Sequence, residues 1–242
     1  MEPLLGDVSK PLQSEVAVNG YAAFVEYNVY SHRFGRELFQ ASVERQALWS
    51  EIDRAVTSIS DTNIVEAFEK QQAHRKVKGK SISKAINDLL KTRFSELGWK
   101  SESRLFQGEE FGSAWALDFT KTHVSVEVGF NHGSDAAWNV LKPTLASQLN
   151  HIEKEVQTDL GVIIAATPEM KEAGGFDGAI GTTETYKKIL IAMQQLVTVP
   201  IVIIGLLPPR TFRIEVDVHE NDDGKKKSTG KVKLVSQENG AS

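Results

Sequence analysis

The clearest pattern of apolar and polar positions lies in residues 115–142. An apolar segment that contains Asp118 leads into a turn at residues 120–122, and residues 123–130 then alternate between apolar and polar side chains. This alternation predicts a strand, because successive strand side chains point to opposite faces. One face would carry Val124, Val126 and Val128, and the polar face would carry Ser125, Glu127 and Gly129. The pattern therefore predicts a hairpin with Asp118 on its first strand and Glu127 on its second.

Apolar residues at helical spacing predict helices on both sides of this hairpin. The predicted helices cover residues 35–59, 61–73, 81–97, 135–151 and 184–196. Ser81 is the expected N-cap of the third helix, and Pro143 is expected to kink or break the fourth. Continuous apolar runs at residues 160–166 and 200–206 predict strands that are covered on both faces. The strand–helix–strand order indicates an α/β fold, with a central mixed β-sheet flanked by helices.

Changes in composition divide the chain into four parts. We expect an N-terminal arm at residues 1–34, a core at 35–207, a peripheral β-hairpin at 208–235 and a disordered tail at 236–242. Pro208 and Pro209 mark the end of the core.

Composition narrows the class of protein. A chain of 242 residues, of which 40% are hydrophobic, can form one large domain, and no apolar run approaches the roughly 20 residues of a membrane span. There is no cysteine and no HExxH, GxSxG, GxGxxG or P-loop spacing. The lack of cysteine excludes disulfides and thiol nucleophiles. The missing motifs argue against a zinc protease, against an α/β-hydrolase with a GxSxG nucleophile, and against a Rossmann or P-loop nucleotide-binding site. With no secretory signal at Met1, a cytoplasmic protein is expected.

The two carboxylates of the predicted hairpin could hold a metal ion. Mg²⁺ binds through one or two carboxylates together with water and substrate phosphate, and it can activate water for attack on a phosphodiester. From spacing alone the simpler interpretation is favoured, in which Asp118 caps a turn and Glu127 is a solvated strand residue.

A resemblance to a known family favours the metal-binding interpretation instead. Asp118, eight intervening residues and then Glu127-Val128 resemble the PD-(D/E)xK motif of the BglII and BstYI type of restriction endonuclease. The likeness extends in order over about residues 35–207, with matching segments at 48–52, 85–100, 160–164 and 199–206. It implies a restriction-endonuclease-like core and Mg²⁺-dependent hydrolysis of double-stranded DNA at a short palindromic site. It also implies a homodimer and a cognate methyltransferase in the same system.

The resemblance assigns roles to several residues. Asp118, Glu127 and the backbone carbonyl of Val128 would bind the metal, and Glu102 would complete the site unless it is an ordinary loop carboxylate. The family pattern has Lys, Gln or Glu two residues after the Glu, where this chain has Gly129. The nearby Asn131 or His132 would then help to position or deprotonate the attacking water.

Two further segments are candidates for DNA contact. Lys78 and Lys80, together with Ser81, precede a predicted helix N-terminus, where backbone N–H groups favour phosphate. The resemblance places the glycine-rich segment 171–183 in the major groove, with Asp177, Thr182 and Thr183 as the candidates for base contact. For this loop, a flexible connector is an equally good interpretation.

Two other functions remain open at the level of sequence. Because of Gly129, the chain could be a DNA-binding protein that keeps the nuclease fold without the chemistry. It could also be a repair nuclease that recognises DNA structure. The net charge of −4 speaks mildly against binding by bulk charge, although basic clusters occur at residues 74–80 and 225–227.

Overall fold

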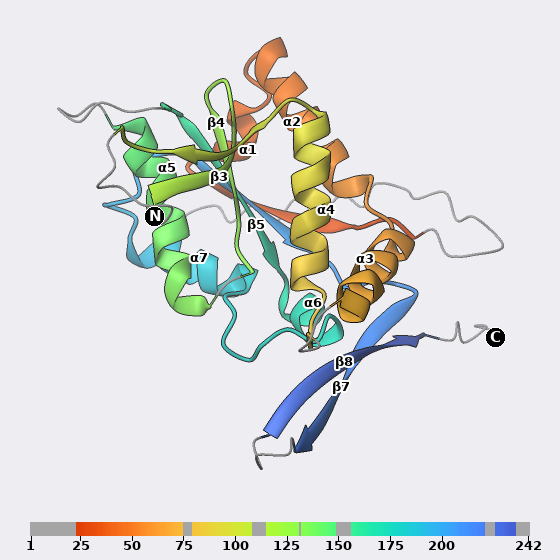
Figure 1. The fold of residues 1–242 in the computed structure, drawn as a ribbon. Helices are drawn as coiled ribbons and strands as arrows, with labels where there is room; N and C mark the ends of the chain where they lie inside the picture. The colour runs from red at the N-terminus through yellow and green to blue at the C-terminus, as the bar shows by residue number, and fades with distance from the viewer. Residues whose placement is uncertain are drawn as a thin grey trace, which may run out of the picture.

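The structure, a computed structural model, describes residues 23–74, 79–107, 115–130, 132–148, 156–220 and 226–235. Its centre is a six-stranded sheet in the order β1-β6-β5-β4-β3-β2 (Figure 1). The strands are β1 (Tyr27–His32), β2 (Lys100–Arg104), β3 (Ala116–Lys121), β4 (Val124–Val128), β5 (Leu160–Ala166) and β6 (Ile201–Leu206). β4, β5 and β6 run parallel to one another, whereas the other pairings are antiparallel. The expected mixed α/β sheet is confirmed.

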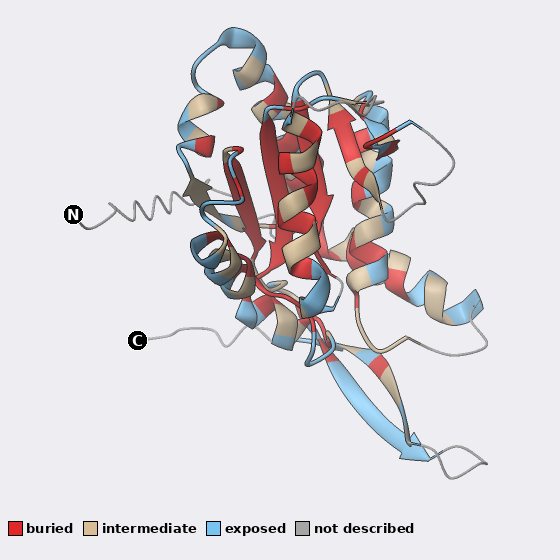
Figure 2. Ribbon diagram, turned by 90° about the vertical axis from the view of Figure 1, so that its left-hand side faces the viewer, coloured by how far each residue is buried: buried red, intermediate tan, exposed pale blue. Residues whose placement is uncertain are grey.

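Helices cover both faces of this sheet. They are α1 (Gly35–Leu38), α2 (Val43–Thr57), α3 (Asp61–His74), α4 (Ser83–Glu96), α5 (Ala136–Ser147), α6 (Pro168–Ala173) and α7 (Thr183–Ala192), with a short 3₁₀ helix at Gly133–Asp135. One face packs Val126 and Val162 against apolar residues of α2, α3 and α4. The other packs Ile163 and Ile203 against α5 and α7. Figure 2 shows the central strands buried between these layers. No helix in the described ranges has the length and apolarity needed to cross a membrane.

Several predicted boundaries shift in the structure. The single helix expected at residues 35–59 is two helices, because Ser42 caps a new start by accepting the Arg45 N–H at 3.2 Å. Ser81 is not an N-cap: α4 begins at Ser83, and the Ser81 hydroxyl bonds to the Ser83 hydroxyl at 2.9 Å. The Ile82 N–H donates to the carbonyl of Gly174 at the end of α6. This contact with a segment distant in sequence fixes the chain just before α4.

Three other segments also differ from expectation. Residues 27–32, assigned to the arm, form the edge strand β1, paired with β6. The beginning of the glycine-rich segment is helical, as part of α6. Pro143 does not break α5, and its ring packs against Gly161, where an added Cβ would lie 2.9 Å from the Pro143 Cβ. Residues 1–22 of the expected arm and the expected tail at 236–242 lie outside the described ranges.

The C-terminal hairpin, β7 (Phe212–Glu220) and β8 (Lys226–Leu234), forms a separate two-stranded sheet that projects from the body (Figures 1 and 2). Its base is anchored by Asp61, at the start of α3. The buried Asp61 Oδ2 accepts the N–H of Arg210 at 3.0 Å, the N–H of Thr211 at 2.9 Å and the Thr211 hydroxyl at 2.8 Å. One carboxyl group thus orders the chain that leads into β7.

We expect the charge and the hydrogen bonds of Asp61 to have separable effects on stability. Asp61→Ala leaves buried donors without an acceptor and should lower the free energy of unfolding by about 1–3 kcal/mol. Asp61→Asn keeps an acceptor oxygen and should cost less. Burial raises the pKa of Asp61 above its usual 3.8, so the folded state favours the neutral carboxyl. Wild type should therefore lose stability relative to Asp61→Asn as the pH rises above about 4.

Urea unfolding at several pH values measures both effects. Asp159→Asn, at an exposed carboxylate, is the control. Equal losses for Asp61→Ala and Asp61→Asn would contradict an anchoring role for these hydrogen bonds.

Candidate active site

Asp118 and Glu127 lie side by side on adjacent antiparallel strands. The register that pairs Phe119 with Val126 makes these two residues cross-strand neighbours on one face of the sheet. The Asp118 Oδ2 accepts the Val128 N–H at 2.7 Å, and the Glu127 Oε1 accepts the Asp118 N–H at 3.3 Å. Each carboxyl group is therefore fixed by the backbone of the opposite strand.

The expectation that Glu127 lies on a solvated face is wrong. All five residues of β4 are buried, and Glu127 is 0% exposed. The cause is tertiary: β4 pairs with β5 on its other side, and α5 and α7 cover the face to which Glu127 points. Alternation along a strand cannot distinguish a face covered by a polar helix surface from one that faces water.

The partner of Glu127 on this face is Lys142, which the sequence interpretation missed. Its ammonium forms an ion pair with the Glu127 Oε2 and donates to the carbonyl of Ala116 at 3.0 Å. Lys142 is only 6% exposed. The available signal was its helical position, three residues after Asn139, which places both polar residues on the buried face of α5.

A tyrosine from α7, Tyr186, explains why residue 129 has no side chain. A Cβ at residue 129 would lie 2.0 Å from the Tyr186 Oη and 2.6 Å from its Cζ. The Tyr186 Oη in turn accepts a hydrogen bond from the Asn139 amide at 3.1 Å. Burial raises the pKa of Tyr186 to about 12, so the phenol is neutral. Tyr186, held by Asn139, therefore fills the space that a side chain at residue 129 would need.

The two carboxyl groups suit a cation. Burial, followed by the nearby Asp118 carboxylate, raises the pKa of Glu127 to about 8, and Lys142 acts in the opposite direction. Burial also raises the pKa of Asp118. A bound cation would relieve this cost, and the donors are the hard oxygens that Mg²⁺ prefers. Within the described residues, no three His, Cys, Asp or Glu side chains form a metal-binding group.

The sequence profile of the family described as restriction endonuclease BglII/BglIII matches residues 27–206. That range begins at the first residue of β1 and ends at the last residue of β6. The chain belongs to this restriction endonuclease family. It is a type II site-specific deoxyribonuclease, and the resemblance to the BglII type of restriction endonuclease is confirmed at the level of the family.

One solved structure agrees with this fold. The crystal structure of restriction endonuclease BglII complexed with a DNA 16-mer has a TM-score of 0.53 and 15% sequence identity, covering 87% of this chain and 100% of that chain. The crystal structure of free BglII has the same identity and coverage, with a TM-score of 0.44. No curated protein matches the sequence.

Within the described residues, no hydrogen bond or ion pair joins the other candidates for catalysis to the carboxyl pair. Glu102 occupies the position in β2 beside Asp118 with a φ of 52°, but it is exposed and its carboxylate pairs with Lys91 at 2.6 Å. His132 is exposed, and its Nδ1 is 2.9 Å from the Ser134 hydroxyl. Asn131 lies outside the described residues. The structure therefore brings together Asp118, Glu127 and Val128 by hydrogen bonds, and Glu102 is near enough for its charge to add to the larger effect of burial in raising the pKa of Asp118.

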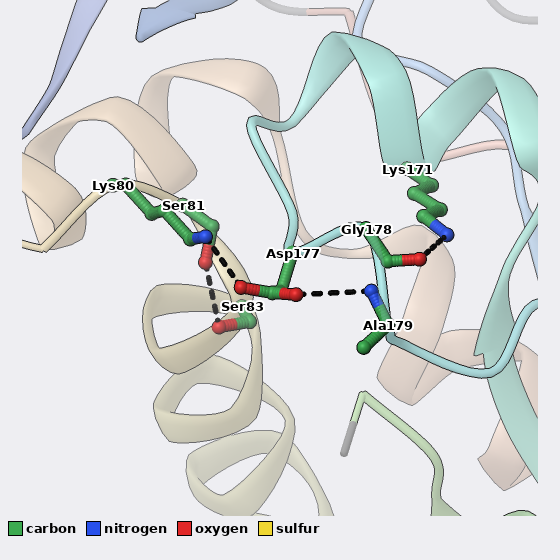
Figure 3. A network of polar contacts seen from close by, with 7 residues as sticks. All are labelled: Lys80, Ser81, Ser83, Lys171, Asp177, Gly178 and Ala179. Carbon is green, nitrogen blue, oxygen red and sulfur yellow. Dashed lines mark hydrogen bonds and ion pairs between the residues drawn. The ribbon is translucent and has the colours of Figure 1, made fainter. Parts of the chain in front are cut away.

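Two of the candidates for DNA contact meet at the loop after α6 (Figure 3). Lys80 forms an ion pair with Asp177 at 2.5 Å, and the other Asp177 oxygen accepts the Ala179 N–H at 2.9 Å. The approach depends on Gly175, which has a φ of +66° and where a Cβ would lie 2.5 Å from the Lys80 carbonyl oxygen. His132 is close enough that its charge helps to lower the pKa of Asp177, after Lys80 and Ala179. Lys78 is outside the described residues.

Thr182 and Thr183, the other two candidates for base contact, lie at the start of α7. Both are buried, at 9% and 5% exposure. The Thr182 N–H donates to the Thr185 hydroxyl at 3.2 Å, and the Thr183 methyl packs over Gly205, where a Cβ would lie 2.6 Å away. These threonines fix the start of α7 on the sheet, a role that a loop pattern in the sequence does not reveal.

We expect Gly129 and Tyr186 to be strongly coupled. Gly129→Ala should destabilise the protein by about 1–3 kcal/mol, because the added methyl overlaps the phenol. The cost should fall substantially in a Tyr186→Ala background, where that space is open. Gly178→Ala is the control, since an added Cβ there meets no atom within 4 Å. Denaturant unfolding of the four proteins measures the coupling, and additive effects would contradict the overlap.

Proposed function

We propose that this restriction endonuclease depends on Mg²⁺, bound by Asp118, Glu127 and the carbonyl of Val128. The observation that carries the proposal is the pair of cross-strand carboxyl groups, each fixed by a backbone N–H of the opposite strand. Such prior fixation reduces the ordering needed when a metal ion and a phosphate bind. When bound, Mg²⁺ would supply an activated water and would stabilise the charge that develops on the phosphodiester.

The chain's own groups have distinct tasks in this proposal. Asp118, which is partly exposed, and Glu127, which is buried, would both bind the metal through their carboxylate oxygens. Glu102 would act on Asp118 through its charge, which adds to the larger effect of burial in raising the pKa of Asp118. Asn131 and His132, just beyond Gly129, would help to position the attacking water.

We further propose that Lys80, Ser81 and Asp177 face the DNA, together with Lys78. Lys80 could exchange its carboxylate partner for a phosphate, and Asp177 would then be released to accept from a base edge. A homodimer would match a palindromic site, because a two-fold protein presents the same surface to both half-sites. A cognate methyltransferase would protect the same site in the host.

Cleavage of unmethylated phage DNA tests the proposed metal dependence and site specificity. With Mg²⁺ we expect discrete fragments on a gel, which disappear when EDTA is added. Sequencing of the fragment ends should give one short palindrome. Intact DNA that still shows a mobility shift would contradict catalysis and leave a DNA-binding protein, whereas cutting only of branched DNA would indicate a repair nuclease.

Removal of one carboxylate tests the proposed metal site. Asp118→Ala should lower the cleavage rate by at least about 100-fold, because one of two protein carboxylates is lost, and it should spare specific DNA binding. Asp159→Ala is the matched control: Asp159 is exposed, pairs with Arg45, and lies at the opposite end of the parallel strands from Val128. Full activity of Asp118→Ala would refute the assignment.

A further inference from the structure

Lys142 is a buried cation inside the site, and no role has so far been assigned to it. It reaches the Glu127 Oε2 from α5, across the layer between helix and sheet, and its second acceptor is the carbonyl of Ala116. Ala116 lies two residues before Asp118 on β3. One ammonium therefore contacts both strands that carry the carboxyl pair.

We propose that Lys142 is a positioning residue of the nuclease site, holding Glu127 in the orientation that DNA cleavage requires. With Oε2 held by Lys142 and Oε1 held by the Asp118 N–H, both oxygens of the Glu127 carboxyl group are fixed. The side chain thus has little freedom to rotate. This inference rests on the proposed function of Asp118 and Glu127.

Because residue 129 has no side chain, a residue of α5 is the group that can hold Glu127 in its orientation. A side chain two residues after Glu127 would point to the same face of β4, but Tyr186 occupies that place. Asn139 orients Tyr186 by a hydrogen bond, and Lys142 lies three residues further along the same helix. Because residues three apart share a helix face, one face of α5 both orients the tyrosine that occupies the position at Gly129 and supplies a cation beside Glu127.

Stability alone does not account for a lysine at this position. A buried ion pair has to offset the cost of removing two charges from water, and well-packed apolar residues of similar volume are often equally stable or better. The surrounding α5 and α7 layer is otherwise rich in apolar side chains, including Val140, Ile163 and Leu190. A buried Lys–Glu pair in such a layer is therefore better explained by the site than by the fold.

The test compares Lys142→Met with Lys121→Met. Lys121 is a suitable control because it also forms an ion pair with a glutamate, Glu51 at 2.8 Å, and donates to the Leu97 carbonyl, but on the other side of the sheet. Single-turnover cleavage is measured over a range of Mg²⁺ concentrations. Binding of Mg²⁺ is measured separately by calorimetry, which does not depend on activity.

At saturating Mg²⁺ we expect Lys142→Met to cut about 100-fold more slowly than wild type, at the upper end of effects seen for residues that orient metal ligands. Its affinity for Mg²⁺ should be equal to or higher than that of wild type, because the ammonium no longer competes for the Glu127 carboxylate. Lys142→Arg, which keeps the charge, should retain more activity than Lys142→Met. Lys121→Met should cut at the wild-type rate.

Recovery of the wild-type rate by Lys142→Met at saturating Mg²⁺ would overturn the inference, because Lys142 would then only neutralise a charge that the metal can neutralise instead. If Lys142→Met does not fold, Lys142→Gln, which retains a donor for the Ala116 carbonyl, takes its place under the same criterion. Asp118→Ala distinguishes a failure of the proposed function from a failure of the positioning role of Lys142. Its full activity would refute the proposed function, whereas its inactivity beside an active Lys142 variant would refute the positioning role alone.

Discussion

Two neighbouring carboxyl groups, of which Glu127 is fully buried and Asp118 partly so, repel one another and lose hydration, and the architecture around β3 and β4 follows from how this cost is met. Each carboxyl group accepts a backbone N–H from the opposite strand, and the Lys142 ammonium neutralises the inner one. These contacts require the hairpin, β5 and α5 to keep a fixed relative position. The pair also remains receptive to a further cation, since burial keeps the pKa values of Asp118 and Glu127 raised.

The layer formed by α5 and α7 shows how one helix face serves both packing and chemistry. Val140 and Ala136 join the apolar cluster against the sheet, while Asn139 and Lys142 on the same buried side serve Tyr186 and Glu127. Gly129 belongs to this arrangement, because Tyr186 can approach β4 only where no Cβ is present. The missing side chain of the family pattern is therefore a consequence of packing in this layer, and it does not by itself indicate lost activity.

The DNA-facing candidates and the C-terminal hairpin are joined by close backbone contacts. The Lys80 carbonyl lies 2.5 Å from where a Cβ would stand at Gly175 and at the same distance from where one would stand at Gly230, on β8. The Gly230 N–H also donates to the Gly79 carbonyl at 3.0 Å. The loop before α4, the loop after α6 and the projecting hairpin thus meet at one point. The Lys80–Asp177 pair stands beside it.

The sequence by itself determined the elements whose signals are local. The alternation at residues 123–130 and the apolar runs at 160–166 and 200–206 sufficed for β4, β5 and β6, and the motif together with matching segments in order over about residues 35–207 sufficed for the family. Only the tertiary structure decided what covers each face. Burial of Glu127, the approach of Tyr186 to Gly129 and the partner of Lys142 depend on residues from separate elements. Their contacts leave no periodic signal, because residues 15 and 57 positions apart meet only after the helices pack on the sheet.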